Sequence, residues 1–187
     1  MKGVVFNLLE EVVRRSYGED TWDALLEAAG LQGSYTSLGS YEDEEMRKLV
    51  AASSTAFAMS GGDVLRWFGR KAMPILAERY PAFFAPHATA RTFALSVNRL
   101  IHPEVRKIYP GADVPTFQFQ DAADGALLMH YRSARKLCAL AEGFIQGAAA
   151  YYAETVAFEH LACMHDGHPQ CSFRIAFVSK ASVDAAA

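Results

Sequence analysis

Apolar residues recur every three or four positions through the first half of the chain, which is the spacing of amphipathic helices. Between Val4 and Arg15, for example, apolar side chains stand at positions 5, 8, 9, 12 and 13. Ser40 and Asp63 precede two such segments and are the predicted N-caps. Pro74 lies inside a predicted helix and is expected to kink it. The predicted helices cover residues 4–15, 21–29, 42 onwards, 64–80 and 92–100, and a helical segment at 102–109 continues or restarts the last of them.

After Pro110-Gly111 the pattern changes to the alternation of apolar and polar residues that is typical of strands. Strands are predicted at 116–120, 126–131, 155–161 and 171–178, with a long helix at 135–153. This order predicts an α+β fold, with an N-terminal helical part and a four-stranded antiparallel sheet on which the long helix packs. One domain is expected over 1–178, helical to about residue 110 and sheet plus helix from about 111, followed by a flexible tail at 179–187.

Composition and charge mainly exclude certain classes of protein and partner. The 187 residues carry a formal net charge of −3 and no dense basic run, which argues against nucleic acid as a partner. Glu10 and Glu11 interrupt the apolar N-terminal stretch before a signal-peptide core forms, and no apolar run approaches the roughly 20 residues that span a bilayer. The three cysteines are odd in number and all follow residue 137, which argues against a disulfide framework. A cytoplasmic protein without membrane insertion is expected.

Two stretches carry candidate chemistry, whereas the P-loop, Gly-x-Ser-x-Gly and His-Glu-x-x-His motifs of common enzymes are absent. His102 follows two large apolar residues, and a neutral imidazole is the commonest protein ligand of transition metals. Tyr131, Ser133 and Arg135 alternate, so their side chains point to one side of an extended backbone. A phenol, a hydroxyl and a guanidinium together suit carboxylate oxygens. Haem needs an axial ligand and a carboxylate-binding group, because it carries an iron and two propionates.

Each signal alone also has a purely structural interpretation. His102 fits a hydrogen-bonded core or cap histidine as well as a ligand. Ser133 fits the N-cap of a helix that follows a strand. Neither stretch is specific by itself.

Four segments together resemble the haem nitric oxide/oxygen binding family, the H-NOX domains, which include the sensor domain of soluble guanylate cyclase. They are Met1-Lys2-Gly3, the stretch around His102, Tyr109-Pro110-Gly111 through Pro115, and the Tyr-x-Ser-x-Arg motif at 131–135. The resemblance covers Met1 to about Val178, and the motif with its upstream histidine is the specific part.

The resemblance implies a haem b whose proximal ligand is His102. It further implies that Tyr131, Ser133 and Arg135 hold the propionates and that Pro115 packs against the porphyrin. Nitric oxide weakens the bond between the iron and a trans histidine, so loss of that bond would free the helix that carries His102.

The resemblance also implies a distal pocket without a hydrogen-bond donor. Oxygen-binding members of the family carry a distal tyrosine at the position that Leu140 matches here. The residues matched to this pocket are Val5, Leu9, Ala72, Leu76, Leu140 and Phe144. A stable oxygen complex needs a polar donor, whereas nitric oxide and carbon monoxide depend on one much less. The protein is therefore expected to bind nitric oxide and carbon monoxide but not oxygen stably.

Four later residues suggest a second metal site. Cys138, His160, Cys163 and Cys171 offer the Cys3His set of a closed, tetrahedral zinc site, although buried cysteines also serve as plain packing residues. Some bacterial members of the resembled family are similar here and bind zinc with this set. His165 and His168 compete for the role of fourth ligand, and thiolate oxidation would allow a redox role.

The resulting expectation is a haem-based nitric oxide sensor that is not an enzyme. No output domain is expected within 187 residues, so the resemblance implies a separate histidine kinase or cyclic-di-GMP enzyme as the signalling partner. Two alternatives stay open: a haem-free zinc-binding or redox regulatory module, and a haem enzyme, which would need a distal acid–base residue.

Overall fold

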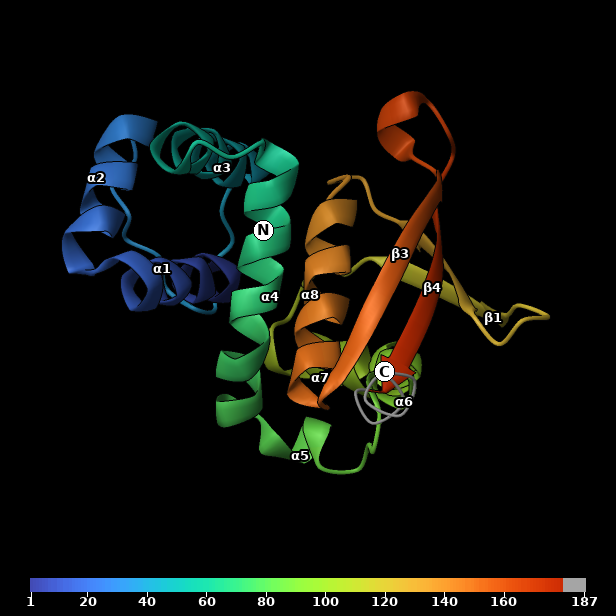
Figure 1. Ribbon diagram of the computed structural model, residues 1–187. Helices are drawn as coiled ribbons and strands as arrows, with labels where there is room; N and C mark the ends of the chain where they lie inside the picture. Colours follow the sequence, from blue (N-terminus) through green and yellow to red (C-terminus); the bar gives the residue numbers. More distant parts are fainter. Residues whose placement is uncertain (180–187) are drawn as a thin grey trace.

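Helices form the N-terminal part of the chain and a sheet forms most of the rest, as the computed structural model shows over residues 1–179 (Figure 1). The helices are α1 (Gly3–Tyr17), α2 (Glu19–Ala29), α3 (Asp43–Phe57), α4 (Gly61–Arg79), α5 (Pro81–Phe84), α6 (Ala90–Ser96), the π-helix η1 (Val97–Ile101), α7 (His102–Ile108), α8 (Cys138–Tyr151) and the 3-10 helix η2 (Met164–Asp166). The strands are β1 (Thr116–Asp121), β2 (Leu127–Arg132), β3 (Glu154–Ala162) and β4 (Cys171–Ser179). This arrangement confirms the predicted α+β class.

The four strands form one antiparallel sheet in the order β1-β2-β4-β3. Helix α8 lies between this sheet and α4, so the molecule has three layers at this point (Figure 1). The side of α8 that faces the sheet contributes Cys138, Ala141 and Ile145 to a buried cluster with β2 and β4. Strand β4 extends to Ser179, which pairs with Glu154, so the first residue of the predicted tail belongs to a strand. The rest of that prediction, residues 180–187, lies outside the described residues.

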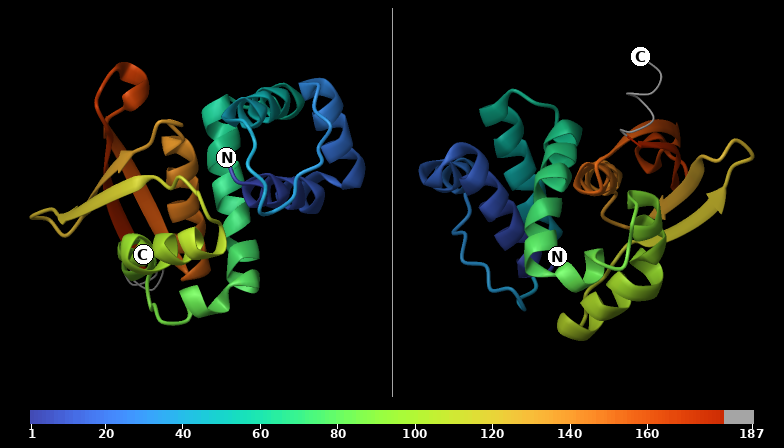
Figure 2. Two further views of the ribbon diagram at one scale, coloured as in Figure 1. Left: turned by 180° about the vertical axis from the view of Figure 1, so that it is seen from behind. Right: turned by 60° about the horizontal axis from the view of Figure 1, so that its bottom comes forward.

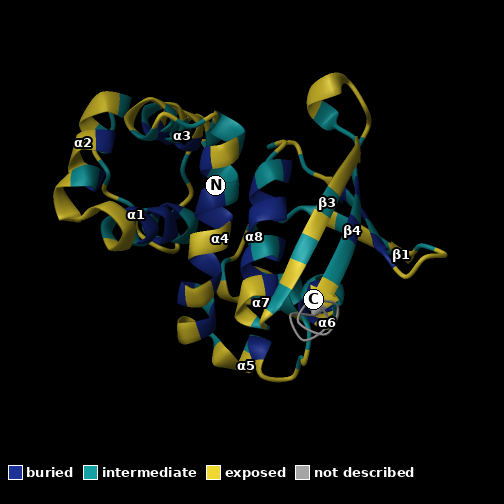
Figure 3. Ribbon diagram, in the orientation of Figure 1, coloured by how far each residue is buried: buried dark blue, intermediate teal, exposed yellow. Residues whose placement is uncertain are grey.

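The N-terminal helices bury their apolar stripes against one another, as their 3.6-residue periodicity predicts. Phe6, Leu9 and Val12 of α1 are almost fully buried with Leu49 of α3 and Phe68 of α4. Figure 3 shows buried positions along α1, α4 and α8, where these elements meet. None of the helices within residues 1–179 is long and apolar enough to cross a membrane.

Glycines allow α4 and α8 to approach closely. A Cβ added at Gly143 of α8 would lie 2.3 Å from the carbonyl oxygen of Arg66 on α4. A Cβ added at Gly69 of α4 would lie 2.6 Å from the backbone nitrogen of Phe144 on α8. Because both neighbours are backbone atoms, any larger residue would force the helices apart.

Three predicted helix starts are wrong, each because a longer-range or neighbouring contact decides the boundary. Ser40 does not cap α3, because it pairs with Lys2 in an isolated β-bridge, and the N-cap position falls to Glu42. Ser60, not Asp63, caps α4, since its hydroxyl accepts the Asp63 backbone N–H at 3.1 Å. Helix α8 begins at Cys138 rather than at 135.

Two predicted helices can be described more fully from the structure. Helix α4 contains Pro74, as predicted, and runs as one helix from Gly61 to Arg79. The predicted helical segments 92–100 and 102–109 follow each other without a loop, as α6, the π-helix η1 and α7. Figures 1 and 2 place α6 and α7 beside β1, on the far side of α8 from α2 and α3. This position puts the start of α7 next to the sheet.

Candidate functional site

His102 is the first residue of α7 and follows directly on the π-helix η1. Its ring is half-buried and lies 5.8 Å, centroid to centroid, from that of Phe117 on β1. Burial, with a further contribution from the positive charge of Arg106, lowers the pKa of His102 to about 4. No hydrogen bond to this ring is present among residues 1–179. The structure therefore presents a neutral imidazole with a free nitrogen lone pair, which is the form that binds a metal.

Tyr131 lies near the end of β2, opposite Phe117, and its ring centroid is 5.5 Å from that of Phe117. Its side chain is almost fully buried, and burial raises the pKa of its phenol to about 12. The Tyr131 hydroxyl accepts the backbone N–H of Leu137 at 3.0 Å. The Phe117 ring thus contacts both the Tyr131 phenol and the His102 imidazole.

The geometry expected for Tyr131, Ser133 and Arg135 is wrong in one respect. Strand β2 ends at Arg132, and residues 133–136 form a turn in which the Ser133 hydroxyl accepts the Arg135 backbone N–H at 3.3 Å. The three side chains therefore do not alternate along one extended strand. Ser133 caps this turn and not the following helix.

The Arg135 guanidinium binds two carboxylates that the sequence analysis did not single out. Its Nε lies 2.8 Å from Asp43 Oδ1 on α3, and its Nη1 lies 3.0 Å from Asp113 Oδ2 before β1. The N-terminal ammonium of Met1 lies 2.9 Å from the same Asp43 oxygen. Burial alone would raise the pKa of Asp43, but the guanidinium and the ammonium together hold it below its usual range. Asp43 and Arg135 are 92 residues apart in the chain, so the sequence gives no signal that they meet.

The residues matched to the distal pocket come together in one apolar cluster between α1, α4 and α8. Leu9, Ala72 and Leu140 are buried members of this cluster, and Val5, Leu76 and Phe144 pack against it. The close α4–α8 contact fixes the spacing between the pairs on these two helices. Pro115 lies half-buried immediately before β1, two residues from Phe117.

These residues fit a haem by their chemistry. His102 offers an unpartnered neutral imidazole, and the apolar cluster offers a dry wall for a porphyrin ring. Tyr131, Ser133 and Arg135 would supply polar groups for the propionates, and in the structure the Arg135 guanidinium is shared between the carboxylates of Asp43 and Asp113. When bound, the haem would supply a ferrous iron with an open position for a diatomic gas.

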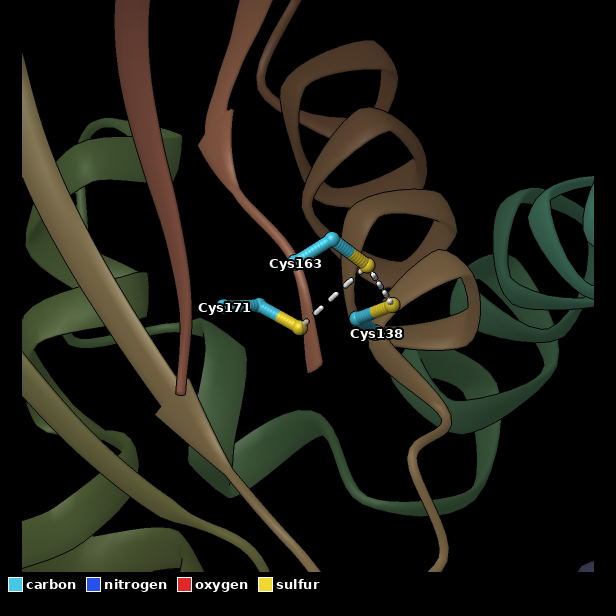
Figure 4. Close-up of side chains that lie close together, drawn as sticks. All are labelled: Cys138, Cys163 and Cys171. Atoms are coloured by element: carbon cyan, nitrogen blue, oxygen red, sulfur yellow. Dashed lines mark hydrogen bonds between the residues drawn. The ribbon is translucent and has the colours of Figure 1, made fainter. Parts of the chain in front are cut away.

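Three cysteines form a separate cluster at the start of α8, whose first residue is Cys138 (Figure 4). The sulfur of Cys163 lies 4.0 Å from that of Cys138 and 3.8 Å from that of Cys171. Two sulfurs on one tetrahedral zinc, each at about 2.3 Å from it, would be about 3.8 Å apart. Burial raises the pKa of the Cys138 and Cys171 thiols, so a cation would have to compensate their thiolate forms. The spacing suits one shared metal ion.

The proposed fourth ligand does not reach this cluster. The His160 ring stacks on Phe173 with centroids 4.2 Å apart, next to an irregularity of the β3–β4 pairing between His160 and Ala162. His165, its competitor, is hydrogen-bonded to the Lys136 carbonyl at 2.9 Å. Both histidines line, with Cys138 and Cys163, a cleft of about 480 Å³ between the N-terminal helices and the sheet part.

Comparisons with known proteins agree with this fold. The family model described as Haem-NO-binding matches residues 2–160. The structure of an H-NOX protein from Shewanella oneidensis in the Fe(II)NO state is 30% identical, with a TM-score of 0.87 over 95% of this chain and 99% of that one. An Fe(II) unliganded H-NOX protein from K. algicida is 27% identical, with a TM-score of 0.81 over 96% of this chain and 98% of that one.

Among curated proteins, soluble guanylate cyclase gcy-32 of Caenorhabditis elegans is 25% identical in an alignment of 143 residues that covers 72% of this chain. The match covers only 20% of that relative, so the chain spans about a fifth of its length. The fold and the family match define a haem-binding gas-sensor domain, which is not an enzyme. The chain belongs to the Haem-NO-binding family, and the solved structures compared above are H-NOX proteins.

Proposed function

We propose that this domain senses nitric oxide, binds carbon monoxide at the same site, and does not hold oxygen stably. His102 would be the axial ligand of haem b, and Tyr131, Ser133 and Arg135 would hold its propionates. Pro115 would pack against the porphyrin. The signal would pass to a separate protein, for which a histidine kinase or a cyclic-di-GMP enzyme is our candidate.

The composition of the apolar cluster is the observation that supports the proposed preference for nitric oxide and carbon monoxide over oxygen. None of the six side chains matched to the distal pocket has a hydrogen-bond donor. Tyr35 and Tyr41 pack against the same cluster, but the Tyr35 hydroxyl donates to Glu45 at 2.8 Å and the Tyr41 hydroxyl donates to the Ser34 carbonyl at 3.1 Å. These contacts engage both phenols, so neither the six matched side chains nor these two tyrosines would offer a donor to bound oxygen.

The protein's own carboxylates and the haem propionates would compete for the Arg135 guanidinium. Its guanidinium already balances Asp43 and Asp113, so a propionate would share it or displace one carboxylate. Asp43 belongs to α3 and Asp113 to the segment before β1. Arg135 would therefore report the state of the haem to both parts of the domain.

Helix α7 supports the proposal that the signal leaves through His102. None of its residues is buried, whereas α6 before it buries Ala90, Phe93, Ala94 and Ser96. An element with so little buried surface is free to change position at small cost. The position of α7 would depend on whether His102 is bound to the haem iron. This dependence is the two-state behaviour that a sensor needs.

Absorption spectra of the purified ferrous protein test the proposed function. We expect a Soret band that shifts with nitric oxide and with carbon monoxide, and a ferrous spectrum that air does not convert into a stable oxygen complex. A protein that takes up no haem would favour the alternative of a zinc-binding or redox module. A stable oxygen complex would show that a distal donor exists and would overturn the gas selectivity.

A zinc site is the second proposal, and the sulfur spacing of Cys138, Cys163 and Cys171 carries it. We propose His160 as fourth ligand, reached by rotation of its side chain away from Phe173. Elemental analysis of protein purified without chelator should give about one zinc per chain, as a closed site requires. Replacing His160 by Ala should weaken zinc binding more than replacing His165 by Ala. The reverse order would assign the fourth position to His165.

A further inference from the structure

The turn that leads into His102 is a π-helix placed between two α-helices. The His102 N–H bonds to the carbonyl of Val97, five residues earlier, whereas an α-helix would use the carbonyl four residues earlier. Single π turns inside α-helices are rare and occur frequently at functional sites. Here the turn ends on the residue proposed as haem ligand.

Pro103 provides a physical reason for this turn. A proline ring clashes with the carbonyl four residues before it in an α-helix, which here is that of Arg99. A π turn holds one residue more than an α turn and so moves that carbonyl out of line. Pro103 itself lies in the first turn of α7, where a missing N–H has no cost. The π turn therefore relieves a clash that a regular helix would have to accommodate by a kink.

The extra residue decides where His102 points. Each residue of an α-helix advances about 100° around the axis, so the loss of one residue from the turn would rotate the next side chain by about that angle. His102 is the first residue after the turn. In an α turn its ring would leave Phe117, which it now meets at 5.8 Å.

Asn98 fastens the same turn to the sheet. Its side-chain amide donates to the backbone carbonyl of Phe117 on β1 at 2.6 Å. The backbone of Phe117 thus holds the π turn, while the ring of Phe117 packs on His102. The turn is fixed by Pro103 at one end and by Asn98 near the other.

We propose that Pro103 is a positioning residue that aims the His102 imidazole at the haem by imposing the π turn, with Asn98 holding that turn against β1. The inference rests on the proposed function, because it concerns the direction of the proposed axial ligand. It adds two residues that neither touch the haem in this account nor belong to the Tyr-x-Ser-x-Arg motif.

The test compares Pro103→Ala with unmodified protein by resonance Raman spectroscopy of the ferrous state. Alanine removes the clash with Arg99 and restores an N–H, so the turn should relax to an α-helix and the iron–histidine band should lose most of its intensity. Through-hydrogen-bond couplings in labelled protein should show the His102 amide acceptor change from Val97 to Asn98. The control is Pro81→Ala, since Pro81 also lies in the first turn of a helix, α5, and should leave the band unchanged.

The outcomes separate this inference from the proposed function. If unmodified protein lacks an iron–histidine band, the proposed function fails. If that band is present and Pro103→Ala leaves it unchanged, the positioning role is overturned. Should Pro103→Ala fail to fold, Asn98→Asp removes the donor with little change of shape, and it must shift the band, or the inference is refuted.

Discussion

Replacing Gly143 by Ala should destabilise the domain, although alanine is the better helix former. The new methyl carbon would lie 2.3 Å from the Arg66 carbonyl oxygen and 2.8 Å from the Arg66 Cα. Both are backbone atoms of α4, so no side-chain rotation relieves the contact. Helix α4 or α8 must move by roughly an ångström to restore a normal contact distance.

The magnitude follows from two opposing effects. Alanine in place of glycine inside a helix contributes about 1 kcal/mol of stability. Overpacking of a well-packed core typically costs about 1–3 kcal/mol, and a clash between two backbones belongs at or above the upper end of that range. We expect a net loss of about 2 kcal/mol, which for a domain of this length corresponds to a fall in Tm of roughly 4–8 °C.

Urea unfolding followed by circular dichroism measures this loss. The matched control is Gly62→Ala on α4, where the nearest atom to the new Cβ is a guanidinium nitrogen of Arg66 at 3.4 Å. That variant should be as stable as unmodified protein or slightly more so. Equal stability of Gly143→Ala and Gly62→Ala would mean that α4 and α8 do not touch at Gly143, and the account of their close approach would be wrong.

Four further predictions concern the metals and the gas. His102→Ala should purify with little haem and should regain it with added imidazole; normal haem content without imidazole would exclude His102 as ligand. Arg135→Ala should speed haem transfer to a scavenger more than Ser133→Ala, because a guanidinium makes bidentate, charge-assisted contacts and a hydroxyl makes one neutral contact. Cys163→Ser should lower bound zinc to well below one equivalent per chain and destabilise the sheet part, as measured by elemental analysis and unfolding; unchanged zinc would favour a packing role. Leu140→Tyr should slow oxygen dissociation in flash-photolysis traces by placing a donor in the apolar cluster; an unchanged rate would mean that its hydroxyl does not reach the gas.

The local pattern of the sequence was enough to predict the longer helices, the four strands and their succession along the chain, but not the short helices α5 and η2 or the order of the strands in the sheet. Strand alternation and helical spacing are properties of neighbouring residues, and the sheet at β1–β4 follows them closely. Helix boundaries depended on partners elsewhere, which is why Lys2 takes Ser40 away from its predicted capping role. The π turn was missed because a single extra residue hardly changes the apolar spacing of 92–109.

The candidate site was predictable only where its members carry distinctive chemistry. His102 and the three cysteines could be singled out because few residue types bind metals. The contact between Arg135 and Asp43 joins two segments that nothing in the sequence pairs, so it required the fold. The position of His160 depends on an irregularity in the β3–β4 pairing, which spacing alone does not reveal.

A gas sensor needs one part that resists displacement and another that yields. Helices α4 and α8 form the resistant part, because their contact at Gly69 and Gly143 leaves no room for adjustment. They hold the apolar cluster at a fixed spacing, so the binding of a small gas changes little on that side. Helix α7 buries none of its residues and is connected to the sheet mainly through the neighbourhood of His102 and through Asn98 in the preceding turn. If the bond between the haem iron and His102 broke, α7 would therefore be the element that moves. A partner protein that contacts α7 would detect this movement.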